Sequence, residues 1–264
     1  MHGRPAHLGV VDWGIGGLGL LGRLDAAVPG LAVTYWSDTG AAPYGLLGPP
    51  ALADRLRLVV AALADRGCTE VVLACNAAST AVDRLADAAL PVDGIIGAGL
   101  AATEAALAAL DRPDAGEVLV GVVGGQGTIR SGRYRRGLAA PGRRVRSRVA
   151  QPLSAHIEAG RTGSPAFEAD LARIVGPLRG AAAVVLACTH YPAAAPSFAA
   201  QLPGTVLVDP AAALADELVA RHGAAAADRT GARTFVTTGD PAALRRGAAR
   251  AWSYAVADAA RVRA

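Results

Sequence analysis

The chain contains no lysine, and all 26 of its lysine-or-arginine positions are arginine. This absence disfavours two classes of protein on chemical grounds. A pyridoxal-phosphate enzyme needs a lysine for its Schiff base, and a P-loop nucleotide-binding protein needs the lysine of its phosphate-binding loop. A coding bias toward arginine and alanine accounts for the absence, but its chemical consequence is the same.

Cysteine is scarce as well, with only Cys68, Cys75 and Cys188. An odd count argues against a disulfide framework, and no CxxC or HxxxH spacing suggests a metal site. No apolar run reaches the ~18 residues that cross a bilayer without a charge or a turn, and Met1–His7 lacks the apolar core of a secretory leader. We therefore expect a cytoplasmic protein with neither a metal nor a membrane partner.

Acidic residues are outnumbered, which leaves a formal net charge of +4, and arginines gather between Arg130 and Arg148. A nucleic-acid-binding patch is one interpretation of this segment. Aromatic residues interleave there only at Tyr134, however, and any solvated face of a chain without lysine must use arginine. We favour an ordinary surface and predict no nucleic-acid partner.

What the chain has in abundance is apolar material, 52% of its 264 residues, which is enough for one large or two modest α/β domains. Short runs that are β-branched and apolar on both faces alternate with helical patterns, as in parallel sheets covered by helices. The expected strands are Leu8–Val11, Ala32–Trp36, Val71–Ala74, Gly94–Ile96, Val118–Val123, Val145–Ala150, Val184–Ala187, Val206–Val208 and Thr234–Thr237. The clearest helical patterns are Ala51–Arg66, Glu168–Leu178 and Ala211–Arg221.

An internal repeat indicates two related halves. Val71–Cys75 and Val184–Cys188 both spell VVLAC, and GVV occurs at Gly9–Val11 and again at Gly121–Val123. The two offsets, 113 and 112 residues, are nearly equal. We predict a first α/β domain of residues 1–96 plus 208–264 and a second of residues 97–207, with the active site in the cleft between them.

The repeat places Cys75 and Cys188 directly after equivalent strands. Ligands of parallel α/β units bind beyond the carboxyl ends of the strands, and a cleft between domains is the usual ligand site. Either cysteine alone is better explained as a small buried hydrophobe, but the matched pair favours chemistry. Racemisation needs one acid/base on each face of an α-carbon, and a thiol with an ordinary pKa of about 8.5 can be tuned to that task. His190 is the expected partner of Cys188, and Asp12 ends the first strand, where its carboxylate projects into the same cleft.

The segment after the first strand supplies an alternative from another class. Gly14, Gly16 and Gly19 form GxGxxG, and Asp38 follows about 20 residues on, as in a dinucleotide-binding fingerprint. That pattern would make the protein a nucleotide-binding oxidoreductase. A glycine turn that directs backbone N–H groups at a substrate carboxylate explains the same residues. We favour the second interpretation, because Asp12 stands where a pyrophosphate would approach.

Six motifs resemble glutamate racemase of the aspartate/glutamate racemase superfamily in order and spacing, and the resemblance covers nearly the whole chain, from Leu8 to Asp240. They are DWGIGG, SDTGAAPYG, ACNAAS, TIRSGRY, ACTHYP and TTGD. The resemblance implies two α/β domains, no cofactor, and two cysteine acid/bases that interconvert L- and D-glutamate or a related amino acid, with a role in peptidoglycan biosynthesis.

By the same resemblance, Asp12 assists Cys75, while Glu158 and His190 assist Cys188. A solvated helix residue remains the alternative interpretation of Glu158. The substrate-binding positions that the resemblance implies are Trp13, Tyr44, Gly45, Asn76, Ala77 and Thr189.

Four positions depart from the family pattern. Trp13 replaces a serine, Ala77 and Gly125 replace threonines, and Gly97 stands in a segment that usually reads I-E-P-G. Each lost hydroxyl partner of a charged ligand costs about 1.5–3 kcal/mol. The catalytic frame therefore matches the family while the recognition of glutamate is altered, and Trp13 either fills the pocket or packs between the domains.

Further alternatives stay open at this point. The protein is a racemase or epimerase of a different, less polar acid, or a catalytically silent binding or regulatory homologue. Decarboxylating relatives keep only one of the two cysteines, so the presence of both argues against that branch. We expect a small-molecule amino acid as the partner and leave a homodimer open.

Overall fold

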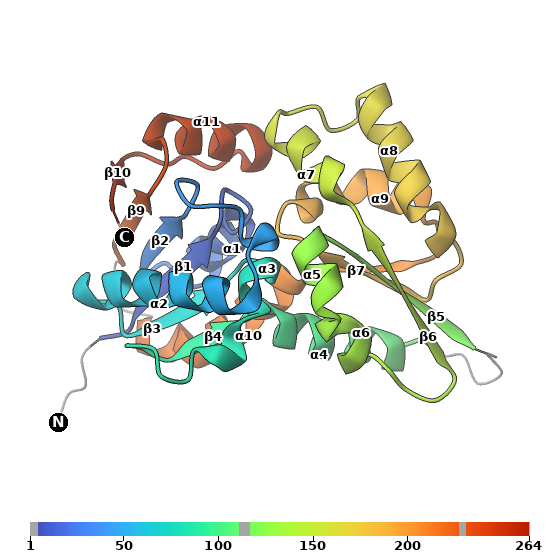
Figure 1. The fold of residues 1–264 in the computed structure, drawn as a ribbon, viewed down its shortest axis with the longest axis horizontal. Helices are drawn as coiled ribbons and strands as arrows, with labels where there is room; N and C mark the ends of the chain where they lie inside the picture. Colours follow the sequence, from blue (N-terminus) through green and yellow to red (C-terminus); the bar gives the residue numbers. More distant parts are fainter. Residues whose placement is uncertain (1–4, 111–116, 227–230, 264) are drawn as a thin grey trace.

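The computed structural model describes residues 5–110, 117–226 and 231–263. Of the Met1–His7 segment, which was examined above for a secretory leader, residues 1–4 lie outside the described residues. Two parallel β-sheets, each covered by helices, lie side by side (Figure 1). The predicted α/β class with two parallel sheets is therefore confirmed. In the described residues no helix combines the length and the apolarity that a bilayer crossing requires.

The strands are parallel throughout both sheets. The first sheet has the order β10 (Ala259–Arg261), β9 (Arg233–Thr237), β2 (Ala32–Ser37), β1 (His7–Asp12), β3 (Glu70–Leu73) and β4 (Val92–Gly94). The second has the order β6 (Arg143–Val149), β5 (Val118–Gly124), β7 (Ala183–Ala187) and β8 (Val206–Val208). The division into residues 1–96 plus 208–264 and 97–207 stays a prediction.

The α-helices are α1 (Leu18–Ala27), α2 (Pro49–Asp65), α3 (Asn76–Ser79), α4 (Ile95–Ala108), α5 (Gln126–Ser131), α6 (Arg133–Gly137), α7 (Gln151–Glu158), α8 (Pro165–Val175), α9 (Ala195–Gln201), α10 (Pro210–Ala226) and α11 (Pro241–Trp252). Short 3₁₀ turns are η1 (Tyr44–Leu46), η2 (Val82–Arg84), η3 (Gly176–Leu178) and η4 (Tyr191–Ala194). The three clearest helical patterns correspond to α2, α8 with η3, and α10. The pattern at Glu168–Leu178 changes to a 3₁₀ turn at Gly176, because Pro177 has no N–H to continue the helix.

One expected strand was misplaced and another was missed. The strand expected at Gly94–Ile96 lies at Val92–Gly94, and Ile95 instead begins α4. Both isoleucines are buried on this helix, and the Ile95 backbone N–H donates to the Ser79 hydroxyl at 3.1 Å. A short apolar run does not by itself distinguish a buried strand from a buried helix start. Strand β10 was not predicted, because its sequence, Ala-Ala-Arg, does not show the alternating or β-branched apolar pattern of a strand.

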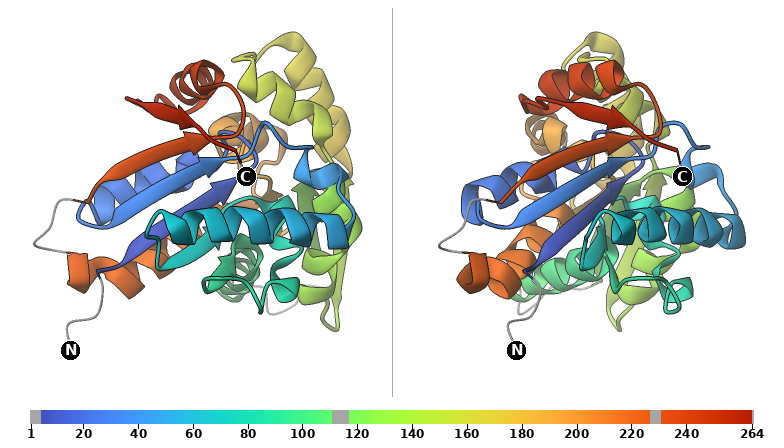
Figure 2. Two further views of the ribbon diagram at one scale, coloured as in Figure 1. Left: turned by 60° about the vertical axis from the view of Figure 1, so that its left-hand side comes forward. Right: turned by 90° about the vertical axis from the view of Figure 1, so that its left-hand side faces the viewer.

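Alternating side chains of β1 enter two cores on opposite faces of the first sheet. Val10 packs in the cluster that includes α1 and α10, whereas Val11 packs in the cluster that includes α2. Helices α1 and α2 accordingly lie on opposite faces of the sheet (Figure 2). Helix α10 also contacts α4, which packs on β7 and β8 of the second sheet. The two sheets are thus joined by the packing of α10 on α4.

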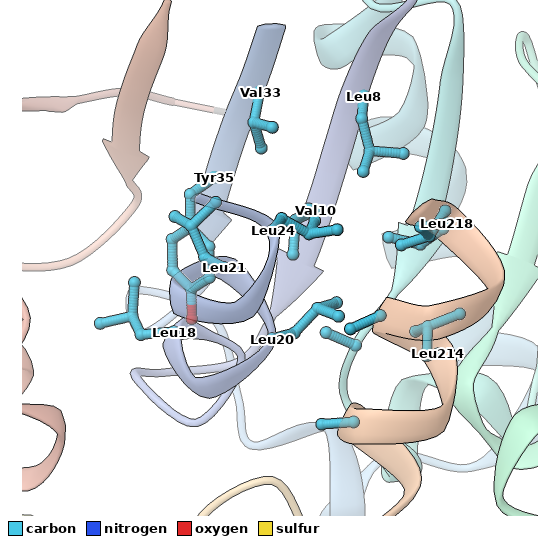
Figure 3. Close-up of a cluster of buried hydrophobic side chains, with 14 of the residues drawn as sticks. Leu8, Val10, Leu18, Leu20, Leu21, Leu24, Val33, Tyr35, Leu214 and Leu218 are labelled. Carbon is cyan, nitrogen blue, oxygen red and sulfur yellow. The ribbon is translucent and has the colours of Figure 1, made fainter. Parts of the chain in front are cut away.

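We predict that Leu20→Ala lowers the free energy of unfolding by about 2–5 kcal/mol, because it leaves a cavity in a packed core. Leu20 is fully buried and lies between β1 and α10, near Leu214 (Figure 3). The matched control is Leu58→Ala on α2, where the leucine is 55% exposed and the change should stay within about 0.5 kcal/mol. Urea unfolding measures both variants, and equal losses would contradict the assignment of the core.

Candidate active site

A cleft of about 590 Å³ lies where the segments that follow β1, β3, β5 and β7 converge. Each of these segments follows the carboxyl end of a strand, and the strands are neighbours within the two sheets. Side chains that are far apart in the sequence therefore meet in the cleft. The lining residues that sequence analysis singled out are Asp12, Trp13, Tyr44, Gly45, Cys75, Asn76, Ala77, Gly125, Glu158, Cys188, Thr189 and His190.

Cys75 lies at the amino end of α3, just past β3, where the chain turns out of the sheet. Burial raises the pKa of its thiol well above the ordinary range, and the negative charge of the nearby Asp12 carboxylate raises it further. Backbone N–H groups of Ala78 and Ala77 oppose this shift without cancelling it. The neutral thiol is therefore the resting form of Cys75, which suits a group that delivers a proton.

Cys188 has a different environment, although it follows the equivalent strand β7. Its sulfur lies 3.7 Å from Nδ1 of His190, and Nε2 of the same imidazole lies 2.8 Å from Oε1 of Glu158. Burial alone would lower the pKa of His190, but its contacts with Cys188 and Glu158 outweigh burial and raise that pKa well above its ordinary value. The two contacts therefore favour the protonated, cationic imidazole. A cation at this position stabilises negative charge on the Cys188 sulfur.

Asp12 connects the two halves of the cleft. Its carboxylate is buried and accepts the Gly14 N–H at 2.7 Å and the Thr189 hydroxyl at 3.0 Å. Burial raises the pKa of Asp12, and the opposing charge of His190 only partly offsets this. The approach of Thr189 requires glycine at position 16, because a Cβ there would lie 2.0 Å from the Thr189 hydroxyl oxygen.

Asn76 lines the cleft and has one unsatisfied hydrogen-bond donor. Its Oδ1 accepts the Tyr134 hydroxyl at 2.9 Å, while its buried Nδ2 has no hydrogen-bond partner among the described residues. Buried polar groups are normally paired, so this amide suits a bound acceptor such as a carboxylate. Tyr44 differs, because its hydroxyl donates to Asp38 at 2.8 Å and is already committed to the protein.

Trp13 lines the cleft and does not turn away from it. Its indole N–H donates to the Ala41 carbonyl at 3.1 Å, and part of the ring packs against the core beside α2. The indole therefore offers the cleft an apolar surface and no free donor. The structure therefore places Trp13 at the cleft, and the ring packs on the core of the first sheet and not between the domains.

The interpretation of the glycine-rich segment as a dinucleotide-binding fingerprint is wrong. Asp38, the acidic residue that it requires, is completely buried and accepts hydrogen bonds from Tyr44, Arg55 and Thr238. A carboxylate so committed cannot bind a ribose. Gly19 packs against the ring of Trp252, where a Cβ would lie 2.6 Å from a ring carbon.

The arginine-rich segment is largely committed within the protein. Arg143 pairs with Glu104, Arg146 donates to the Pro177 carbonyl at 2.7 Å, and Arg148 donates to the Ile174 carbonyl at 3.0 Å. These contacts support the ordinary-surface interpretation.

Several residues that line the cleft were not predicted from the sequence, and one predicted position lies elsewhere. The additional polar ones are Gln126, Thr128, Gln151 and Ser154. Gln151 follows the end of β6, so the rule that ligands bind beyond strand ends could have identified it. Gly97, one of the departures from the family pattern, lies outside the cleft and lines a separate cavity with Asp83 and Arg133. Among the described residues, no group of histidine, cysteine and acidic side chains has an arrangement that could hold a metal.

The chain is similar to several known proteins in both sequence and structure. The family model described as Asp/Glu/Hydantoin racemase matches residues 20–218. A glutamate racemase of Deinococcus radiodurans is 36% identical over 254 residues, which are 90% of this chain and 83% of that protein. One of Pseudomonas entomophila is 35% identical over 224 residues, 83% of this chain and 82% of that protein. The crystal structure of glutamate racemase from Thermus thermophilus in complex with beta-chloro-D-alanine is similar with a TM-score of 0.84 at 28% identity, covering 98% of this chain and 97% of that one.

We predict that Glu158→Gln lowers the pH at which His190 loses its proton, because it removes the carboxylate that stabilises the imidazolium. The pKa of His190 should move down toward the ordinary value of about 6.5. Titration of ¹⁵N-labelled histidine by NMR measures the shift. Glu217→Gln, at an exposed position on α10, is the matched control and should leave the titration unchanged. An unchanged midpoint in Glu158→Gln would show that the 2.8 Å contact does not hold the charge of His190.

Proposed function

The chain belongs to the Asp/Glu/hydantoin racemase family and is a racemase of the glutamate racemase type, and we propose that Cys75 and Cys188 are the two acid/bases of its reaction. The observation that carries the proposal is the position of the two thiols, which follow the equivalent strands β3 and β7 and line one cleft. Racemisation requires such a pair, because a proton removed from one face of the α-carbon must be replaced on the other.

The proposed reaction starts with Cys188 as the base. Its thiolate, beside the His190 cation, takes the α-proton from one face of the amino acid and becomes a thiol. The electron pair of the broken C–H bond remains on the substrate as a carbanion. Cys75 then donates its proton to the opposite face and becomes the thiolate, so that the configuration at the α-carbon is inverted. The other enantiomer reacts by the same two transfers in reverse.

The neighbouring polar groups position the substrate in this proposal. The buried Asp12 carboxylate favours the substrate ammonium, and the unsatisfied Nδ2 of Asn76 favours a carboxylate. Thr189 fixes Asp12 through its hydroxyl. Glutamate or a related amino acid is the proposed substrate. The peptidoglycan role, the cytoplasmic location and the homodimer remain predictions.

The wild-type protein, incubated with an amino-acid substrate in deuterated water without added cofactor, should place deuterium at Cα of both enantiomers. We predict that Cys75→Ala and Cys188→Ala each reduce racemisation to below about 1% of the wild-type rate, because one acid/base is lost from one face. Chiral chromatography with mass spectrometry measures both products.

Cys68→Ala is the matched control, because Cys68 is buried in the core beside α2 and does not line the cleft. It should racemise at nearly the wild-type rate. Rapid racemisation by either cleft variant would exclude the two-thiol mechanism, and the absence of any α-deuterium with wild-type protein would exclude the racemase function.

We predict that Trp13→Ser raises kcat/KM for glutamate by about tenfold or more, equivalent to ~1.4 kcal/mol of transition-state binding. The indole lines the cleft and keeps its N–H on Ala41, whereas serine would provide both space and a hydroxyl. Trp252→Phe, at the end of α11 and away from the cleft lining, controls for the loss of an indole. If the wild type already turns over glutamate rapidly and Trp13→Ser is no better, the indole has only a packing role.

A further inference from the structure

Gln151 places its side-chain amide at the rim of the cleft. It follows a strand other than β3 and β7, which precede the two cysteines. It begins α7 immediately after β6, and its side chain reaches across to the segment that follows β5. Its Oε1 lies 3.3 Å from the backbone nitrogen of Gln126 and accepts that N–H. Because a backbone N–H can only donate, this contact fixes which end of the amide is the oxygen and leaves the two donors of Nε2 for other partners.

The position that Gln151 occupies is adjacent to Gly125. A Cβ built on Gly125 would lie 3.4 Å from the Gln151 Oε1 and would meet no other atom within 4 Å. The glutamine amide therefore borders the space that a side chain at position 125 would enter, at ordinary van der Waals contact distance from its Cβ. A larger residue there, such as the threonine expected from the family pattern, would compete with Gln151 for that space.

Several cleft residues that were expected to bind the substrate offer no free side-chain donor. Ala77 and Gly125 have no polar side chain, the Trp13 N–H is bonded to Ala41, and the Tyr44 hydroxyl is bonded to Asp38. An amino-acid substrate nevertheless brings at least one carboxylate, whose oxygens need hydrogen-bond donors when they are removed from water. Nε2 of Gln151 is a donor at the rim to which no described residue is hydrogen-bonded.

We propose that Gln151 is a substrate-binding residue whose carboxamide donates to a carboxylate of the amino acid and thereby replaces the side chain that is absent at Gly125. This inference rests on the proposed racemase function. It makes Gln151 and Gly125 a compensating pair, so that the two positions must be changed together to keep substrate affinity.

The test is a double-mutant cycle on KM, with the initial rate of α-deuterium exchange measured against the concentration of L-glutamate. Gln151→Ala should raise KM about 10- to 100-fold, which corresponds to one lost hydrogen bond to a charged group, while kcat changes little. Gly125→Thr alone should also raise KM, because its side chain displaces the amide. The combination Gly125→Thr with Gln151→Ala should recover much of the loss, because the hydroxyl then has room.

Gln151→Glu separates binding from structure. It retains an oxygen acceptor for the Gln126 N–H and the length of the side chain, but it replaces the donors with a negative charge. The proposal predicts a rise in KM at least as large as that of Gln151→Ala, whereas a purely structural role predicts wild-type kinetics. Gln201→Ala, on α9 and outside the cleft lining, is the matched control for the loss of a glutamine amide.

Two further arms identify which carboxylate is bound. If Gln151 binds the α-carboxylate, its loss should raise KM equally for glutamate and glutamine, and if it binds the side-chain carboxylate, only for glutamate. Either result supports the proposal. Unchanged KM for both substrates in Gln151→Ala and Gln151→Glu, with α-proton exchange intact, would overturn it and leave the racemase function standing. Absence of exchange in the wild type would instead overturn the function itself.

Discussion

The hydrogen bond from the Thr189 hydroxyl to the Asp12 carboxylate joins the carboxyl ends of the two sheets across the cleft. It is buried, and it forms only because Gly16 lets the loop after β1 approach the loop after β7. A carboxylate in this position cannot be left unpaired, since a buried charge without partners is strongly destabilising. The bond therefore fixes the relative positions of the loops that carry the reactive groups, and the negative charge of Asp12 adds to the effect of burial in raising the pKa of the Cys75 thiol.

The cleft combines a symmetric backbone with asymmetric chemistry. Cys75 and Cys188 follow equivalent strands but have different neighbours. Cys75 is buried close to the Asp12 carboxylate, whereas Cys188 contacts His190, which in turn contacts Glu158. Such a difference suits a reaction in which one group must hold a proton while the other accepts one. The repeat thus provides two equivalent positions, and unrelated neighbours give each position its protonation state.

We infer that substrate recognition departs from the expected family pattern at several positions of the cleft. Trp13 brings bulk into the cleft, and Ala77 and Gly125 remove side-chain atoms from it. The Gln151 amide stands next to Gly125, within van der Waals contact of a Cβ at that position. Losses and gains at neighbouring positions are more informative than any single departure, because a pocket binds by its total shape and its donors.

Much of the fold and the catalytic frame could be predicted from the sequence alone. Apolar runs and their spacing indicated nearly all the strands, and the VVLAC repeat placed both cysteines at strand ends, because these signals depend on residues close together in the chain. The start of α4 at Ile95 and the strand β10 were not predictable in this way, since short segments take their conformation from what packs on them.

Only the tertiary structure decided how individual polar groups are used. Asp38 fits a nucleotide-binding pattern in sequence, yet Thr238, 200 residues away, donates to it within the protein. Gly97 belongs to a family motif but faces another cavity, and Gln151 belongs to none but reaches the cleft. Thr189 and Asp12 are 177 residues apart. Local patterns determine helices and strands, but the hydrogen-bond partners of a buried side chain come from distant segments, which are placed only when the chain has folded.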